Sequence, residues 1–319
     1  MVSPPIVQGD ESIELALAAL ADGLLVGLPT ETVYGLAADA SNPAAVARIF
    51  AAKGRPSFNP LIAHVAGVSE GAAEGQMDHR ALALAEAFWP GPLTLVVPVN
   101  PAGVTCELAR AGLSTIGLRV PAHPLARELI SAHGGPLAAP SANPSGKLSP
   151  TSAHDVAEAF GQEVALVING GPSSAGIESA IVAVVGDDQP RLLRPGAIAR
   201  AELEALVGPL GARQSGSIDA PGQLSSHYAP RAALRLNASS RRPGEVLLGF
   251  GPGKEADLNL SVNSDTVEAA ANLYRMLREL DSMGADTIAV MPIPEYGLGE
   301  AINDRLRRAA APRNPEPTE

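Results

Sequence analysis

The stretch KGRPSFNPLIAH, residues 53–64, joins a predicted helix to a predicted strand and carries two cations, a carboxamide and an imidazole. A turn made stiff by Gly and Pro holds its cations in place, so less freedom is lost when they bind an anion. Two structural alternatives stay open. Lys53 and Arg55 could complement the dipole of a helix end, and His64 could be a structural histidine. The stretch favours a loop that binds an anionic ligand.

The composition of the 319-residue chain is that of a globular protein, with 46% hydrophobic and 3% aromatic residues, and the length allows two domains. A single cysteine, Cys106, excludes an intramolecular disulfide and a Cys-rich zinc site. We find no signal-peptide pattern and no apolar run long enough for a bilayer. We therefore expect a cytoplasmic protein that does not associate with membranes.

Charge is distributed unevenly along the chain, whose net charge is −11. Residues 1–206 contain 11 Lys and Arg against 20 Asp and Glu, a net charge of −9, and residues 207–319 contain 12 against 14, a net charge of −2. An acidic body argues against broad, salt-driven binding of nucleic acid. It leaves room for a local basic pocket that takes one small anion.

The first two thirds of the chain mix helices and strands without strict alternation, which predicts an α/β domain with a mixed sheet. Asn42 and Pro43 suit the N-cap and first turn of a helix. We predict helices over 12–21, 43–53, 123–133 and 151–160, and strands over 24–28, 61–65, 93–98, 115–120, 137–139, 165–168, 179–185 and 191–194.

The last third begins with a stretch over 208–226 that is rich in Gly, Ser, Pro and Gln and is typical of a linker. Beyond it we predict strands over 245–250 and 286–291 and helices over 265–281 and 299–311, a unit that favours parallel strands. The predicted domains are 10–206, a linker over 207–230, a small α/β domain over 231–311 and a disordered tail over 312–319.

Four further segments gather polar side chains. Each has a structural alternative: a capped turn for Thr30 or Thr32, an ion pair for Arg119 at the end of an apolar strand, and a helix cap for Ser149. The fourth is an ordinary hairpin when taken alone. The segments are PTETVYGL (29–36), STIGLRVP (114–121), APSANPSGKLSPT (139–151), and GIESAIV (176–182) with RLLRPG (191–196).

One candidate for a phosphate-binding loop does not match the Walker A motif. The segment GFGPGK, residues 249–254, follows a predicted strand, but Glu255 stands where a Walker A loop has Ser or Thr. We interpret it as an ordinary loop.

In this order and at these intervals, the segments resemble the YrdC-type threonylcarbamoyl-AMP synthases over residues 10–206. SSHYAP (225–230) and GLGEAINDRL (297–306) resemble the longer form of that family. The resemblance implies a YrdC-like twisted mixed-sheet domain, a linker and a small Rossmann-like α/β domain. Gln223 stands where the family's linker usually has Met, which affects the apolar contact of a linker expected to cover the pocket as a lid.

The family's activity is implied in the same way. It condenses L-threonine, bicarbonate or CO₂, and ATP with Mg²⁺ into threonylcarbamoyl-AMP and pyrophosphate. A partner transferase complex then modifies adenosine in tRNA, and weak tRNA binding by the chain is conceivable. A closed pocket would protect an unstable carbamate, whose oxygen attacks the α-phosphorus.

The resemblance also assigns ligand-binding positions, although no side chain is identified as a general base and no metal ligand is predicted. The threonine-binding positions are Thr32, His64, Arg119 and Ser179. The ATP-binding positions are Arg55, Asn59, Thr115, Ser141, Ser149 and Arg194, to which we add Lys53, Asn143, Lys147 and Tyr228 from the same motifs.

Two other functions compete with this one. The family fold has a concave face that could hold double-stranded RNA without adenylation, and the −9 charge of the first domain argues against it. A carbamoyl-transferring relative used in hydrogenase maturation carries zinc-finger and acylphosphatase domains. A chain with one cysteine does not fit that pattern.

Overall fold

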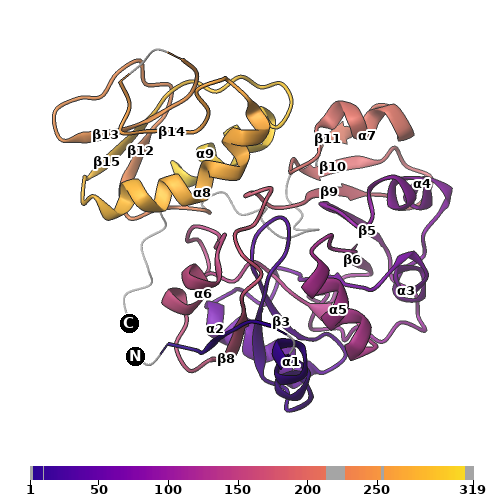
Figure 1. The fold of residues 1–319 in the computed structure, drawn as a ribbon. Helices are drawn as coiled ribbons and strands as arrows, with labels where there is room; N and C mark the ends of the chain where they lie inside the picture. The colour runs from indigo at the N-terminus through magenta and orange to yellow at the C-terminus, as the bar shows by residue number, and fades with distance from the viewer. Residues whose placement is uncertain (1–2, 10, 213–226, 253–254, 313–319) are drawn as a thin grey trace.

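The protein, seen here as a computed structural model, contains a large α/β unit and a smaller one beside it (Figure 1). The predicted fold class is confirmed, because the large unit has a twisted mixed sheet and the small one a parallel sheet. The predicted lid around Gln223, the Lys254 position and the predicted tail beyond residue 312 lie outside the described residues. The structure describes residues 3–9, 11–212, 227–252 and 255–312.

Within the described residues the large sheet has the strand order β1-β8-β2-β3-β7-β4-β6-β5-β9-β10-β11. The sheet is mixed, with parallel pairs such as β4 with β6 and antiparallel pairs such as β5 with β6. The strands are β1 (Ile6–Val7), β2 (Leu25–Leu28), β3 (Gly35–Asp39), β4 (Ile62–His64), β5 (Leu93–Pro98), β6 (Thr115–Arg119), β7 (Leu137–Ala138), β8 (Val164–Ile168), β9 (Ala180–Ala183), β10 (Arg191–Arg194) and β11 (Gly211–Ala212).

Helices of the large unit pack on this sheet, and α2 shows how local sequence sets their ends. The Asn42 side chain accepts hydrogen bonds from two first-turn N–H groups, and Gly54 ends the helix with φ 57. The helix predicted over 43–53 is therefore confirmed. The helices are α1 (Glu11–Ala21), α2 (Pro43–Lys53), α3 (Val68–Glu74), α4 (His79–Phe88), α5 (Pro124–His133), α6 (Ala153–Ala159) and α7 (Arg200–Val207).

The small unit has the strand order β12-β15-β13-β14, and every pairing in it is parallel. The parallel pair predicted from the sequence is β13 with β15. The elements are β12 (Ala233–Arg235), β13 (Glu245–Gly249), β14 (Leu258–Asn259), β15 (Thr287–Val290), α8 (Thr266–Ser282) and α9 (Gly299–Ala309).

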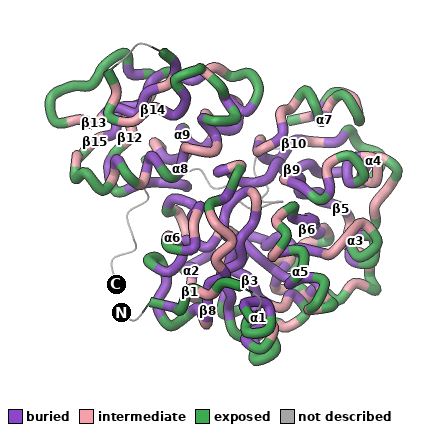
Figure 2. The backbone as a smooth tube through the Cα atoms, in the orientation of Figure 1, coloured by how far each residue is buried: buried purple, intermediate pink, exposed green. Residues whose placement is uncertain are grey.

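The two units share a hydrophobic core at their junction, and buried stretches run through both of them (Figure 2). Val33, Leu148 and Ile177 of the large unit belong to the same buried cluster as the apolar faces of α8 and α9. Gly176 lies so close to α8 that a Cβ atom there would be 2.4 Å from the Ala271 carbonyl oxygen. The small unit is therefore packed directly against the loop that precedes β9.

Candidate active site

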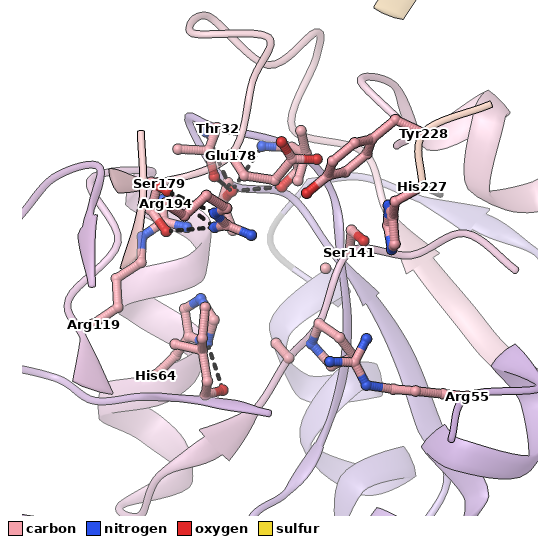
Figure 3. Close-up of a pocket in the computed structure, with 16 residues that line it drawn as sticks. Thr32, Arg55, His64, Arg119, Ser141, Glu178, Ser179, Arg194, His227 and Tyr228 are labelled. Atoms are coloured by element: carbon pink, nitrogen blue, oxygen red, sulfur yellow. Dashed lines mark hydrogen bonds between the residues drawn. The ribbon is translucent and has the colours of Figure 1, made fainter. Parts of the chain in front are cut away.

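One pocket of the large unit collects most of the polar side chains selected from the sequence (Figure 3). Eight of the fourteen predicted site residues line it, from segments that are far apart in the chain. The lining residues are Thr30, Thr32, Val33, Gly35, Arg55, Ile62, His64, Arg119, Ala139, Pro140, Ser141, Glu178, Ser179, Arg194, His227 and Tyr228.

Arg55 comes from the loop between α2 and β4 and is fixed by its own loop. Its Nε donates to the carbonyl oxygen of Asn59 at 3.0 Å, and its Nη2 donates to that of Pro60 at 2.8 Å. Burial lowers the pKa of Arg55 to about 10, so the guanidinium stays charged at neutral pH. The Gly- and Pro-shaped turn thus presents a pre-positioned cation to the pocket.

Arg119 ends β6 and forms a partly buried ion pair with Glu31, with 2.7 Å between Nη2 and Oε1. Its Nε also donates to the Gly91 carbonyl oxygen at 3.3 Å. Burial alone would raise the pKa of Glu31, but the charge and hydrogen bond of Arg119 outweigh it and the pKa is lowered. The structural alternative for Arg119 is therefore realised, while the residue still lines the pocket.

Arg194 ends β10 and reaches across to the residue that precedes β9. Its Nε and Nη2 donate to the Ser179 carbonyl oxygen at 3.1 and 3.0 Å, and Nη2 lies 3.1 Å from the Ser179 hydroxyl. That hydroxyl also lies 2.8 Å from the Thr94 hydroxyl. The two strands of the predicted hairpin thus hold Arg194 and Ser179 together.

The three pocket arginines share one feature. Each uses Nε and Nη2 to anchor itself on protein oxygens, and no hydrogen bond joins its Nη1 to any residue that the structure describes. All three side chains are at least nine-tenths buried. Guanidinium groups that are held rigidly with one open nitrogen suit carboxylate and phosphate oxygens.

His64 faces the pocket from the end of β4 as a neutral imidazole. Burial and the nearby charge of Arg119 lower its pKa to about 3. Its Nδ1 lies 3.3 Å from the Ile62 carbonyl oxygen, which assigns the proton to Nδ1. Nε2 is then a hydrogen-bond acceptor. Thr32 is also buried, and its hydroxyl lies 2.9 Å from that of Thr30.

The side chain of Asn59 is fully buried, and neither its oxygen nor its nitrogen has a hydrogen-bond partner among the described residues. Each unpaired buried polar group costs about 1–3 kcal/mol. Asn59 adjoins Arg55 but is not among the residues that line the pocket, so its predicted contact with ATP stays a prediction.

Two family models match the chain: the Sua5–YciO–YrdC model, described as "Telomere recombination", over residues 18–196, and the threonylcarbamoyl-AMP synthase C-terminal domain over 198–311. The chain belongs to the Sua5/YrdC family. The expected family is thereby confirmed, and the second match covers the longer form of the family.

Close relatives of this Sua5/YrdC chain are threonylcarbamoyl-AMP synthases. The one from Bacillus subtilis is 38% identical and covers 98% of this chain and 96% of its own length. The one from Pyrococcus abyssi is 40% identical, with 94% of each chain covered. The crystal structure of P. abyssi Sua5 complexed with L-threonine superposes with a TM-score of 0.87 at 37% identity, covering 96% and 97% of the two chains.

Lys53 does not line the pocket of this Sua5/YrdC chain. It binds the loop that contains Ser141 and Asn143. Its Nζ donates to the carbonyl oxygens of Ser141 and Asn143, both at 2.5 Å. Burial, with a smaller effect of Arg55, lowers the pKa of Lys53 well below its usual value. The predicted contact of Lys53 with ATP stays a prediction, and the structure adds a positioning role.

Four other predicted residues lie away from the pocket surface. Thr115 is at the opposite end of β6 from Arg119. Asn143 and Lys147 line a second cavity, of about 340 Å³, between α6 and α8. The Ser149 hydroxyl donates to Glu178 Oε1 at 2.5 Å. Their predicted ATP contacts stay predictions.

Three site residues were missing from the sequence-based selection. Glu31 and Glu178 stand inside the quoted motifs, and His227 precedes Tyr228. Burial is the main cause that lowers the pKa of His227 to about 3. The sequence does not single out the two carboxylates, because their partners are remote: Arg119 lies 88 positions from Glu31, and Arg305 lies 127 positions from Glu178.

No helix of the described residues combines the length and apolar character needed to cross a membrane.

Proposed function

We propose that this pocket condenses L-threonine, bicarbonate or CO₂, and ATP into threonylcarbamoyl-AMP, with release of pyrophosphate. The observation that carries the proposal is the set of three buried arginines, Arg55, Arg119 and Arg194, which line one pocket and whose Nη1 atoms form no hydrogen bond to the described residues. They give an acidic chain a site for a carboxylate and a triphosphate. The activity of the relatives supports the same chemistry.

Threonine would occupy the side of the pocket formed by Thr32, His64, Arg119 and Ser179, which Figure 3 shows apart from Arg55. The Nη1 of Arg119 would bind the threonine carboxylate, because Glu31 already holds the rest of that guanidinium. The neutral imidazole of His64 would accept a hydrogen bond from the threonine ammonium or hydroxyl group. The threonine of the P. abyssi Sua5 complex supports a threonine site in this fold.

ATP would lie across from threonine, against Arg55, Ser141 and Tyr228, with Arg194 between the two substrates (Figure 3). The carbamate oxygen of threonine would attack the α-phosphorus, and pyrophosphate would leave. Arg55 and Arg194 would neutralise the phosphate charge that grows in this step. Positioning and charge neutralisation then account for the protein's contribution.

Mg²⁺ would enter as part of the MgATP substrate. Among the described residues, Glu178 is the single carboxylate that lines the pocket, and it is paired with Arg305 at 3.0 Å. The donor set therefore fits an ion held by phosphate oxygens and water. The ion would shield the triphosphate charge.

The product would pass to a partner transferase that modifies adenosine in tRNA, because a mixed anhydride with AMP is a reactive carbonyl donor. The double-stranded RNA module is not favoured, since the relatives that cover nearly the whole chain are synthases.

The test is to incubate the full chain with ATP, Mg²⁺, threonine and ¹³C-bicarbonate and to analyse the products by mass spectrometry. We expect threonylcarbamoyl-AMP that carries the ¹³C label. Glycine in place of threonine is the matched control and should give no labelled adenylate. Absence of a labelled adenylate with threonine would refute the proposal.

A further inference from the structure

Glu178 lies at the junction of the two units, and side chains of the small unit reach it. The Arg305 Nε of α9 donates to Oε2 at 3.0 Å, and the Tyr274 hydroxyl of α8 lies 2.9 and 3.0 Å from the two carboxylate oxygens. Arg305 and Tyr274 are almost completely buried. The Ser149 hydroxyl is the donor from the large unit.

A carboxylate in the wall of a pocket for a triphosphate repels the ligand unless its charge is offset. Burial alone would raise the pKa of Glu178, but Arg305 and then Arg194 hold it at about 2, so the group is ionised at neutral pH. Arg305 supplies the opposite charge from behind the pocket wall. Without Arg305, the charge of Glu178 would be offset mainly by Arg194, which lines the pocket and would then be less available to an anionic ligand.

Tyr228 is fixed by the same helices. Its φ of 64 is unusual for a bulky residue and persists where the surroundings hold it. The N–H of His227 donates to the Arg308 carbonyl oxygen of α9 at 3.3 Å. The Arg305 guanidinium lies 5.5 Å from the Tyr228 ring centre, and the Tyr274 ring lies 5.8 Å from it. The small unit thus orders a second residue of the pocket wall.

We propose that Arg305 and Tyr274 are positioning residues for the nucleotide, so that the small unit completes the ATP side of the active site. They act through Glu178 and Tyr228, which line the pocket, and are not themselves among the lining residues. The identity of the nucleotide rests on the proposed function. The effect should fall mainly on ATP, because Tyr228 lies on the Arg55 side of the pocket, apart from the threonine positions His64 and Arg119 (Figure 3).

The test compares the dissociation constant of MgATP, measured by calorimetry, and the KM of threonine in four variants of the full chain. Arg305→Met removes the counter-charge, and Tyr274→Phe removes one hydrogen-bond donor while it keeps the ring. Arg305→Met combined with Glu178→Gln removes both charges of the pair. Arg307→Met is the matched control on α9, because Arg307 forms an exposed pair with Glu295.

We expect Arg305→Met to weaken MgATP binding about tenfold or more and Tyr274→Phe about threefold, because a hydrogen bond to a charged group is lost in each. Adding Glu178→Gln to Arg305→Met should restore most of the affinity, which a merely structural role of Arg305 would not do. The threonine KM should change less than about threefold, and Arg307→Met should bind MgATP like the wild type.

A folded Arg305→Met variant with wild-type MgATP affinity would overturn the proposal, and so would a double variant that binds as weakly as the single one. If Arg305→Met does not fold, Tyr274→Phe decides, and unchanged MgATP affinity in that variant overturns the proposal. If the wild-type chain binds MgATP but forms no adenylate, only the proposed function is refuted. If the wild-type chain does not bind MgATP, both the proposed function and the positioning role of Arg305 and Tyr274 are refuted.

Discussion

Two arginines of the pocket are anchored differently and should serve different substrates. Arg119 is paired with Glu31, so Arg119→Ala leaves a partly buried carboxylate without its counter-charge, and Glu31→Gln in the same chain removes that side effect. We expect Arg119→Ala with Glu31→Gln to raise the KM of threonine about tenfold more than that of ATP, and Arg55→Ala to do the reverse. Steady-state kinetics with each substrate varied in turn would measure this, and equal losses for both substrates would refute the division.

Replacement of Asn59 should weaken ligand binding without lowering the stability of the chain. Because both amide atoms are buried without partners, Asn59→Leu should leave the free energy of unfolding of the ligand-free chain unchanged or higher, and should weaken MgATP about tenfold or more. Asn42→Leu is the contrasting control, since it removes a helix cap worth about 1 kcal/mol and should not affect MgATP. Chemical denaturation and calorimetry measure the two quantities. A strongly destabilised Asn59→Leu variant with normal affinity would contradict this account.

The lowered pKa values of His64 and His227 should make the stability of the chain depend on pH. Burial holds both pKa values at about 3 in the folded chain, against about 6.5 when unfolded, so only the unfolded chain takes up these protons between the two values. Stability should therefore fall as the pH drops below about 6.5, by about 3 kcal/mol for the pair at pH 5.5.

Chemical denaturation at about pH 7.5, 6.5 and 5.5 would measure this pH effect. His64→Gln should remove about half of it, and the exposed His154→Gln should not change it. Stability that is the same at all three values would be the contrary result.

The site residues that the sequence made predictable are those whose motif is self-contained. Arg55 is an example, because its own turn holds it in place. Glu178 and Lys53 were harder, because their roles depend on partners in other segments. A Lys next to a cationic turn predicts an anion contact, whereas the folded chain buries its ammonium group on two carbonyl oxygens.

Among the elements, the loop before β9 lies close against α8 of the small unit. Gly176 has φ 68, and an added Cβ would lie 2.4 Å from the Ala271 carbonyl oxygen. Gly134 has φ 75 and open space around it, so Gly134→Ala isolates the backbone effect of about 1–2 kcal/mol. We expect Gly176→Ala to destabilise the chain by more than Gly134→Ala and also to weaken MgATP binding. Equal destabilisation by the two variants in chemical denaturation would contradict the close contact.

Most elements followed from the sequence, and the exceptions have physical reasons. The helix over 43–53 carried its own cap signals, so its limits were predictable. The sequence does not predict strand β3, because its first two residues end a motif whose hydroxyls and carboxylate suggest a turn. No prediction was made for α4, although Ala81, Leu84 and Ala85 have the spacing of a buried helical face. The two-residue strands β1, β11 and β14 exist through their partners.

The whole molecule combines an acidic exterior with a pocket where three arginines meet one lining carboxylate. The net charge of −11 disfavours long nucleic acids, while the buried arginines act over a few ångströms on a small anion. The second unit contributes Arg305 and Tyr274 at the back of the same pocket. The chain thus forms one site from two units, which the sequence could not predict because the contacts span the junction.

The release of pyrophosphate by the full chain tests this view of the pocket as a threonine-dependent adenylating site. With MgATP and bicarbonate present, we predict that pyrophosphate appears only when threonine is added, in equal amount to threonylcarbamoyl-AMP. Pyrophosphate release that does not depend on threonine, or no release with all substrates present, would contradict the account.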